Sequence, residues 1–120
     1  MKNKIYTVSR SVPEITPDIK IIAVDFDGCL CKNNWPYIGD PNMPVIIALR
    51  KFRKHGGKVI LWTCRENESL QKAVEWCAVC GLKFDAVNEN LPEMNALYGN
   101  DCRKIGADAY WDDKAVCVKA

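Results

Sequence analysis

Two aspartates separated by one residue stand directly after a short apolar run. The run covers 21–24, and Asp25 and Asp27 follow it, with Gly28 next. In such a pair one carboxylate can stay ionised and attack phosphorus, while the other carries a proton for the leaving group. A strand end or an Asx turn before the glycine would use the same residue types without any chemistry. The pair therefore supplies a candidate nucleophile, Asp25, and a candidate acid–base residue, Asp27.

A second acidic pair, Asp112 and Asp113, follows another apolar segment at 107–111. If both segments are neighbouring parallel strands, all these carboxylates meet at one sheet edge and repel one another unless a divalent cation lies between them. Oxygen ligands suit Mg²⁺. One Mg²⁺ and one lysine leave the four carboxylates with one uncompensated negative charge, so we expect a proton or a further cation as well. The candidate metal ligands are Asp25, Asp27, Asp112 and Asp113.

Helical and strand patterns alternate along the chain. The predicted strands are 21–24, 58–62, 84–87 and 107–111, and the predicted helices run from Asn42 to His55, from 67 to 80 and from 92 to 98. Such alternation predicts an α/β fold, a single Rossmann-like three-layer sandwich with a mostly parallel sheet, whose ligands bind beyond the carboxyl ends of the strands. We expect an N-terminal extension over 1–18 and one core over 19–120, with a short irregular flap at about 29–42.

Length and charge fit one compact domain. The chain has 120 residues with 17 basic and 15 acidic side chains, a balance too even for a protein that coats nucleic acid or a membrane surface. No apolar run approaches the roughly 18 residues that cross a bilayer, and the start lacks the apolar stretch of a secretory signal. We therefore expect a soluble cytoplasmic protein with no membrane partner.

The seven cysteines are an odd number, which a complete internal set of disulfides cannot use. We expect mostly thiols. A C-x-C at Cys29 and Cys31 and a C-x-x-C at Cys77 and Cys80 raise the question of a zinc site. Cys77 lies on the apolar stripe of a predicted helix, so packing as a small hydrophobe is the favoured interpretation, and the same holds for Cys29.

In their order along the chain these motifs resemble those of the haloacid dehalogenase-like superfamily of aspartate-nucleophile phosphohydrolases. Its first motif, D-x-D-G after an apolar strand, is similar to 25–28, and its second, a Ser or Thr after a strand, is similar to Thr63 after 59–62. The lysine of the third motif is best matched by Lys104, with Lys83 as its rival, and the acidic pair of the fourth by 112–113. Four elements in order, each at a strand end, make the resemblance specific.

The resemblance implies a role for each matched residue. Asp25 would attack phosphorus, form an aspartyl phosphate and touch Mg²⁺, while Asp27 would protonate the leaving oxygen and place its backbone carbonyl on the metal. Thr63 would bind a phosphoryl oxygen, Lys104 would neutralise the phosphoryl group, and Asp112, supported by the neighbouring aspartate, would hold Mg²⁺. The activity implied is Mg²⁺-dependent hydrolysis of a phosphomonoester by a small capless enzyme, because the gaps between motifs are too short for a cap domain. The substrate would be a small molecule or an exposed phosphate on a larger one.

Two features near the motifs have open interpretations. Arg65 could bind a second anionic group of the substrate or form a salt bridge with a nearby carboxylate. Trp35 and Tyr37 in the flap could stack on a base or sugar, or they could pin the loop to the core, which is the favoured interpretation. The basic residues at 50–58 indicate a solvated helix face, so nucleic acid is a possible partner that nothing specific indicates.

Other functions would use the same residue types. The site could transfer the phosphoryl group to an acceptor other than water, or act on a polynucleotide end. A receiver-like module that accepts phosphate without turnover also has acidic residues, Thr and Lys at strand ends. In a receiver the lysine comes last, whereas here the pair 112–113 follows Lys104, and this order favours the phosphohydrolase.

Overall fold

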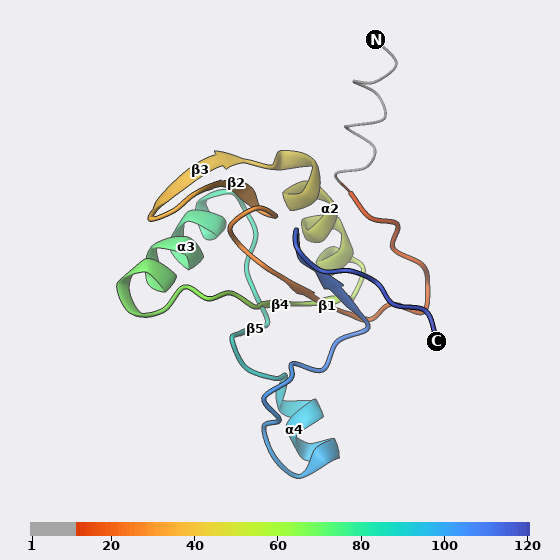
Figure 1. Cartoon of the computed structure of the whole chain (residues 1–120). Coiled ribbons are helices and arrows are strands. Elements are labelled where there is room, and N and C mark those ends of the chain that lie inside the picture. Colours follow the sequence, from red (N-terminus) through yellow and green to blue (C-terminus); the bar gives the residue numbers. More distant parts are fainter. Residues whose placement is uncertain (1–11) are drawn as a thin grey trace.

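A parallel sheet of four strands forms the centre of the computed structural model, which describes residues 12–120. Its strands are β1 (Ile21–Val24), β4 (Lys58–Leu61), β5 (Ala86–Val87) and β6 (Ala109–Trp111). They lie in the order β5-β4-β1-β6, with β1 paired to β4 on one side and to β6 on the other (Figure 1). The central strand is apolar throughout because both of its faces are covered. The predicted Rossmann-like α/β fold is confirmed.

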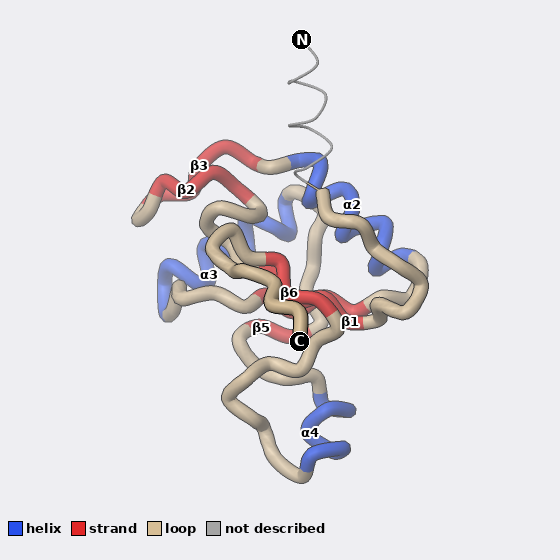
Figure 2. Tube along the Cα trace, turned by 45° about the vertical axis from the view of Figure 1, so that its right-hand side comes forward, coloured by secondary structure: helices blue, strands red, loops and turns tan. Residues whose placement is uncertain are grey.

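Helices cover the two faces of the sheet. Helices α2 (Met43–Lys54) and α3 (Asn67–Val79) lie on one face, and α4 (Pro92–Tyr98) lies on the other (Figures 1 and 2). Side chains alternate along β1, so Ile22 and Val24 join the core under α2 and α3, while Ala23 joins a smaller cluster on the α4 side. This is the predicted three-layer arrangement, and the described residues contain no cap domain.

Two strands are two residues shorter than their sequence patterns predict, and β4 is one residue shorter. The segment 84–87 contributes only the two residues of β5, and 107–111 contributes only the three of β6. Near the start of β6 the Asp108 carboxylate accepts the N–H groups of Lys20 and Ile21, at 2.8 and 2.9 Å. A side chain thus replaces a backbone carbonyl there, and the regular ladder begins one residue later.

The flap contains a β-hairpin where we expected irregular structure. Strands β2 (Cys31–Asn34) and β3 (Tyr37–Pro41) pair in antiparallel fashion, and the hairpin lies beside α3 (Figure 1). Two prolines and a glycine suggested an irregular chain, but Pro36 lies in the turn and Pro41 ends the second strand, where both are tolerated. Gly39 passes so close to the Lys32 carbonyl that a Cβ would have no room.

The chain segments outside the sheet and helices differ in their packing. Of the predicted extension, residues 1–11 lie outside the described part, while Val12 and Ile15 pack against the core. After Trp111 the chain forms no further helix or strand, and Val116 and Val118 are exposed. No helix among residues 12–120 is both long and apolar enough to span a membrane.

Candidate active site

The nucleophile candidate and the second acidic pair meet at the carboxyl edge of the sheet. Asp25 directly follows β1, and Asp112 and Asp113 directly follow its neighbour β6. The Asp25 N–H donates to the Trp111 carbonyl at 2.9 Å, which carries the pairing of the two strands up to the site. One carboxylate oxygen from each of the three aspartates lies within 4.8 Å of the others. Three hard oxygen donors at this spacing could hold a divalent cation such as Mg²⁺.

Gly28 makes the close approach of the two acidic loops possible. Its φ is +87°, a conformation that residues with a side chain rarely adopt, and a Cβ at this position would collide with the Asp113 carboxylate. The Gly28 N–H donates to the Cys31 carbonyl at 2.9 Å, so the turn also starts the hairpin. The glycine of the D-x-D-G motif therefore has two structural tasks at this site.

Burial and like charge act together on Asp25. Desolvation raises the pKa of this carboxyl group above its usual range, and the charges of Asp112 and Asp113 raise it further. Hydrogen bonds from the Phe26 N–H, 2.7 Å from Oδ1, and from the Thr63 hydroxyl lower the pKa and offset part of this effect. A cation among the three carboxylates would remove the repulsion, which is the electrostatic reason to expect one here.

Asp27 does not point its carboxylate at the other three aspartates. It forms a bidentate ion pair with Arg65, in which Nε and one terminal nitrogen each lie 2.8 Å from a carboxylate oxygen. The carboxylate of Asp27 is therefore absent from the acidic cluster that we predicted, and the cluster has three members. The implied metal contact of Asp27 through its backbone carbonyl is unaffected by this pairing.

Of the two interpretations of Arg65, the structure contains the salt bridge with a nearby carboxylate. Only 2% of this side chain is exposed, and besides Asp27 it donates to the Tyr37 carbonyl at 2.9 Å. Its guanidinium carbon lies 4.9 Å from the ring centres of both Phe26 and Trp35. The salt-bridge interpretation is therefore the one that the structure bears out, and Arg65 ties the hairpin to the loop that carries Asp27.

Thr63 reaches the site from the end of β4, as its position after an apolar strand predicts. Its backbone N–H donates to the Asn88 side-chain oxygen at 2.8 Å, and its hydroxyl accepts the backbone N–H of Arg65 at 3.2 Å. Asn88 follows β5 with φ at +53°, so the end of a third strand fixes the loop that holds Thr63. Asn88 is therefore a positioning residue for this loop.

The structure does not bring Lys104 to Asp25. Its Nζ lies 5.6 Å from the centre of the Tyr110 ring, and Lys104 borders a larger neighbouring cavity of about 1000 Å³. Lys83, its rival, is exposed beyond α3 and borders neither cavity. The lysine that lines the cavity with the cluster is Lys114, whose backbone N–H donates to the Asp112 carboxylate at 2.9 Å. Sequence reasoning missed it because it follows the acidic pair, although a basic residue next to an acidic pair was itself a visible signal.

The aspartates open into a cavity of about 430 Å³. Strand ends, hairpin and C-terminal turn all contribute to its walls, which are formed by Asp25, Asp27, Asn33, Trp35, Thr63, Cys64, Arg65, Asp112, Asp113 and Lys114. The larger cavity lacks Asp25 and Thr63, and its lining is mostly apolar and includes the three residues of β6. We place the candidate active site in the smaller cavity because it unites the candidate nucleophile with a hydroxyl donor and a lysine.

The two cysteines of most interest pack rather than react. All seven cysteines lie within residues 12–120 and are free thiols there. Burial raises the pKa of Cys29 to about 12, with the neighbouring aspartates adding to the effect, and its Sγ lies 3.5 Å from the Trp111 carbonyl. Burial likewise raises the pKa of Cys77 to about 12, and this side chain is fully enclosed in the core. Packing, the favoured interpretation of both residues, agrees with these surroundings.

Comparison with known proteins finds a relative without a described activity. No family model and no curated protein matches the chain. A solved structure described as a conserved protein from Bacteroides thetaiotaomicron matches with a TM-score of 0.73 and 36% sequence identity. The match covers 82% of this chain and 79% of the other. The chain therefore belongs to the same family as this conserved Bacteroides protein.

Proposed function

We propose that this protein is a Mg²⁺-dependent phosphomonoester hydrolase that works through an aspartyl phosphate on Asp25. The observation that supports this most is the meeting of Asp25, Asp112 and Asp113 at the end of two adjacent parallel strands, with carboxylate oxygens within 4.8 Å of one another. The resemblance to haloacid dehalogenase-like phosphohydrolases independently gives the same residues these roles.

The proposed reaction has two steps. An Asp25 carboxylate oxygen attacks phosphorus, the bond from phosphorus to the ester oxygen breaks, and the alcohol leaves with a proton. A water molecule then attacks the same phosphorus, inorganic phosphate leaves, and the Asp25 carboxylate is regenerated. Mg²⁺, when bound, neutralises charge on the phosphoryl oxygens and on the aspartates. Thr63 donates its hydroxyl to a phosphoryl oxygen, which positions the group for attack.

Asp27 serves as the acid and base of this reaction. Its ion pair with Arg65 affects when it can carry a proton. A bidentate pair with arginine uses both carboxylate oxygens as acceptors. A protonated carboxyl group keeps only one strong acceptor, so Asp27 carries the leaving-group proton when one of the two Arg65 bonds opens. While both bonds are closed, the positive charge of Arg65 neutralises the fourth carboxylate, that of Asp27. Arg65 is therefore the further cation that the excess of negative charge led us to expect.

Lys114 takes the charge role that the resemblance gives to Lys104. Three carboxylates and one Mg²⁺ leave one negative charge, and we assign its balance to Lys114 because this residue lines the same cavity. The site then meets a phosphate dianion without net repulsion from the protein. A cavity with no cap over it admits a small molecule or a terminal phosphate of a larger one. The free thiols fit a reducing cytoplasm, where we place the protein.

The test is hydrolysis of a generic aryl phosphate by the purified protein. We expect turnover with Mg²⁺, none with a chelator, and a loss of at least about a hundredfold in rate for Asp25→Asn. Asp40→Asn is the matched control, because Asp40 is an exposed hairpin aspartate that does not border the cavity. Unchanged turnover in Asp25→Asn would reject the mechanism. A long-lived phosphoprotein without turnover would instead favour the receiver-like module, and a phosphorylated acceptor would favour a phosphotransferase.

A further inference from the structure

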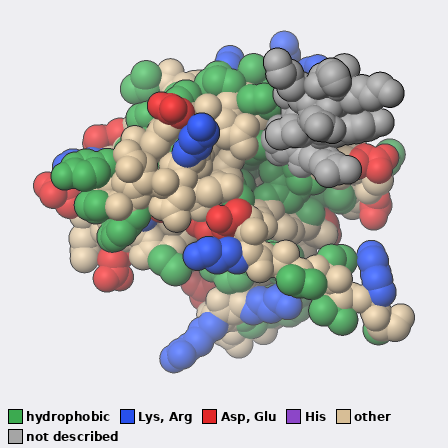
Figure 3. Space-filling model, turned by 45° about the horizontal axis from the view of Figure 1, so that its top comes forward, with side chains coloured by type: hydrophobic (Ala, Val, Ile, Leu, Met, Phe, Trp, Pro, Cys, Tyr) green, Lys and Arg blue, Asp and Glu red, His purple; other side chains and the backbone are tan. Residues whose placement is uncertain are grey.

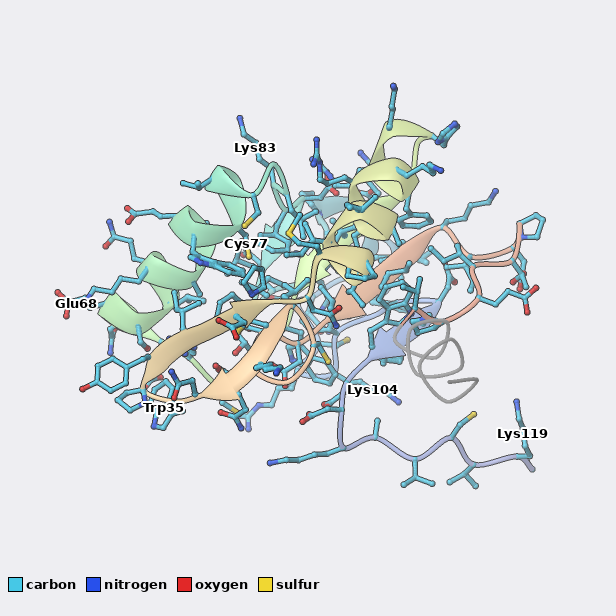
Figure 4. The ribbon with its side chains drawn as sticks, turned by 90° about the horizontal axis from the view of Figure 1, so that it is seen from above. Trp35, Glu68, Cys77, Lys83, Lys104 and Lys119 are labelled. Carbon is cyan, nitrogen blue, oxygen red and sulfur yellow. The ribbon has the colours of Figure 1, made fainter. Side chains whose placement is uncertain are left out.

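The hairpin places a large aromatic side chain in the wall of the cavity that holds Asp25. Trp35 lies at the end of β2 and, with Asn33, borders the cavity shared by Asp25 and Thr63. Its side chain is 59% exposed, although an indole of this size is usually mostly buried in a stable domain. Figure 4 shows Trp35 at the free end of the hairpin, well apart from Lys104. An exposed indole beside a candidate nucleophile needs an explanation.

Pinning the hairpin to the core accounts only for the contact of the indole with the Arg65 guanidinium, and most of the Trp35 side chain stays exposed. The hairpin is held by the Tyr37 backbone carbonyl, which accepts from Arg65 at 2.9 Å. The Tyr37 ring itself is 72% exposed, so neither aromatic side chain of the turn is buried in the core. The alternative of stacking on a ligand remains, and only Trp35 borders the cavity.

The indole is also held in place before any ligand arrives. The Arg65 guanidinium carbon lies 4.9 Å from the Trp35 ring centre, and Arg65 is itself fixed by two bonds to Asp27. The backbone N–H of Trp35 donates to the Asn33 side-chain oxygen at 3.2 Å, and this hydrogen bond stiffens the turn. A ring that is already fixed loses little conformational entropy when a second ring packs on it. More of the stacking energy therefore contributes to binding affinity.

We propose that Trp35 is a stacking platform that makes this site prefer phosphate esters carrying a planar aromatic ring close to the phosphate. The proposal rests on the proposed function of the same site. A cavity of about 430 Å³ holds a phosphoryl group and one ring system, which is within the size range of small-ligand pockets. Stacking of a base on an aromatic side chain is worth about 1–3 kcal/mol by alanine substitution, whereas a sugar or alkyl phosphate gains none of it.

The experiment compares pairs of phosphate esters in which one member carries an aromatic ring and the other does not. Adenosine 5′-phosphate and ribose 5-phosphate have the same kind of ester bond, and benzyl phosphate and cyclohexylmethyl phosphate form a second pair without a sugar. We expect kcat/KM to be higher for the member of each pair that carries an aromatic ring. Trp35→Ala is expected to lower kcat/KM for these aromatic esters by about tenfold, the equivalent of roughly 1.4 kcal/mol, and to leave ribose 5-phosphate and cyclohexylmethyl phosphate nearly unchanged. A preference confined to the adenosine pair would identify a nucleotide as the ligand, and a preference in both pairs would identify aromatic esters in general.

Two further variants separate stacking from support of the fold. Trp35→Phe keeps a ring and is expected to retain most of the discrimination even where Trp35→Ala weakens the hairpin. Tyr37→Ala removes the other exposed ring of the turn but keeps its carbonyl, so it is expected to change neither substrate pair. Equal losses on both members of a pair in Trp35→Ala would overturn the stacking role while leaving the proposed function intact.

Binding provides a readout that does not depend on turnover. The phosphonate analogues of benzyl and cyclohexylmethyl phosphate can be titrated calorimetrically with Mg²⁺ present, and the benzyl analogue is expected to bind about tenfold more weakly to Trp35→Ala. Preferential binding of this analogue without hydrolysis of any ester would refute the hydrolase while supporting the platform. Equal affinity of the two analogues for the unmodified protein would refute the platform.

Discussion

Arg65 and Asp27 lie 38 positions apart and form a two-bond ion pair at 2.8 Å beside the acidic cluster. Arg65 follows β4, and Asp27 lies in the turn after β1, so the pair joins two loops of the site. The same guanidinium reaches the Tyr37 carbonyl in the hairpin. One buried cation therefore fixes three loops around the cavity and neutralises the carboxylate that would otherwise add to the cluster.

Removing Arg65 should cost far more than removing another arginine with similar bonds. Arg53 also makes a two-bond pair, with Asp85 at 3.1 and 3.0 Å, but its side chain is 32% exposed. We expect Arg65→Ala to lower the free energy of unfolding by about 3–5 kcal/mol, because a half-buried carboxylate loses its partner. For Arg53→Ala the expected loss is about 1 kcal/mol, since water can reach this pair. Urea denaturation measures the free energy of unfolding of both variants. Similar losses would show that the Arg65 pair stabilises the fold no more than the Arg53 pair does.

Gly28→Ala tests the close approach of the two acidic loops. Both Gly28 and Gly56 have positive φ, at +87° and +96°, but a Cβ meets the Asp113 carboxylate only at Gly28 and meets nothing within 4 Å at Gly56. Each alanine is expected to cost about 1–2 kcal/mol of stability for the backbone conformation. Only Gly28→Ala should also displace Asp113 and weaken Mg²⁺ binding, by roughly tenfold on calorimetric titration. Unchanged Mg²⁺ affinity in Gly28→Ala would mean that this approach is not needed for the metal.

Much of this arrangement follows from local sequence patterns. The run 21–24 is apolar on both faces and therefore predicts a buried central strand, and the acidic residues after it and after Trp111 predict an edge where charges gather. The helices begin and end within one residue of their predicted bounds. These features depend on short-range periodicity and capping, which a single sequence displays directly.

What could not be predicted depends on contacts between distant residues. Arg65 pairs with Asp27 because its guanidinium is buried between Phe26 and Trp35. No local sequence pattern predicts this packing. Motif order favoured Lys104, with Lys83 as its rival, whereas the lysine that lines the cavity is Lys114 in the turn after β6. Ion pairs and cavity walls of this kind require the packed structure.

Asp25→Asn should stabilise the metal-free protein. Because the pKa of Asp25 is raised in the folded state, mainly by burial, the folded protein holds more protons than the unfolded chain between the two pKa values. Stability therefore falls as pH rises through that window, and the ionised carboxylate is a cost at neutral pH. We expect Asp25→Asn to raise Tm in the presence of a chelator and to reduce the rise in Tm that Mg²⁺ produces.

Asp27→Asn is the matched variant for this comparison and should have the opposite effect. It leaves the buried Arg65 without its carboxylate, so Tm should fall. A lower Tm for Asp25→Asn without metal would contradict the electrostatic account of the cluster.

The cysteines should divide into two classes by their surroundings. Cys64, Cys102 and Cys117 are exposed, whereas burial raises the pKa of Cys29 and of Cys77 to about 12. Because only the thiolate reacts, we expect iodoacetamide at pH 8 to modify the exposed three quickly and these two slowly or only after unfolding. Peptide mass spectrometry at successive times checks the order. Rapid modification of Cys29 in the folded protein would contradict the packing role and would favour a redox-sensitive site.

The most direct measurement is the mass of the peptide that contains Asp25 after acid quenching during turnover with Mg²⁺. We expect the added mass of one phosphoryl group on Asp25, lost after reduction with borohydride, which converts the aspartyl phosphate to homoserine. The modification should be absent from Asp25→Asn and from samples with chelator. Turnover accompanied by phosphate on another residue, or hydrolysis that persists undiminished in Asp25→Asn, would contradict it.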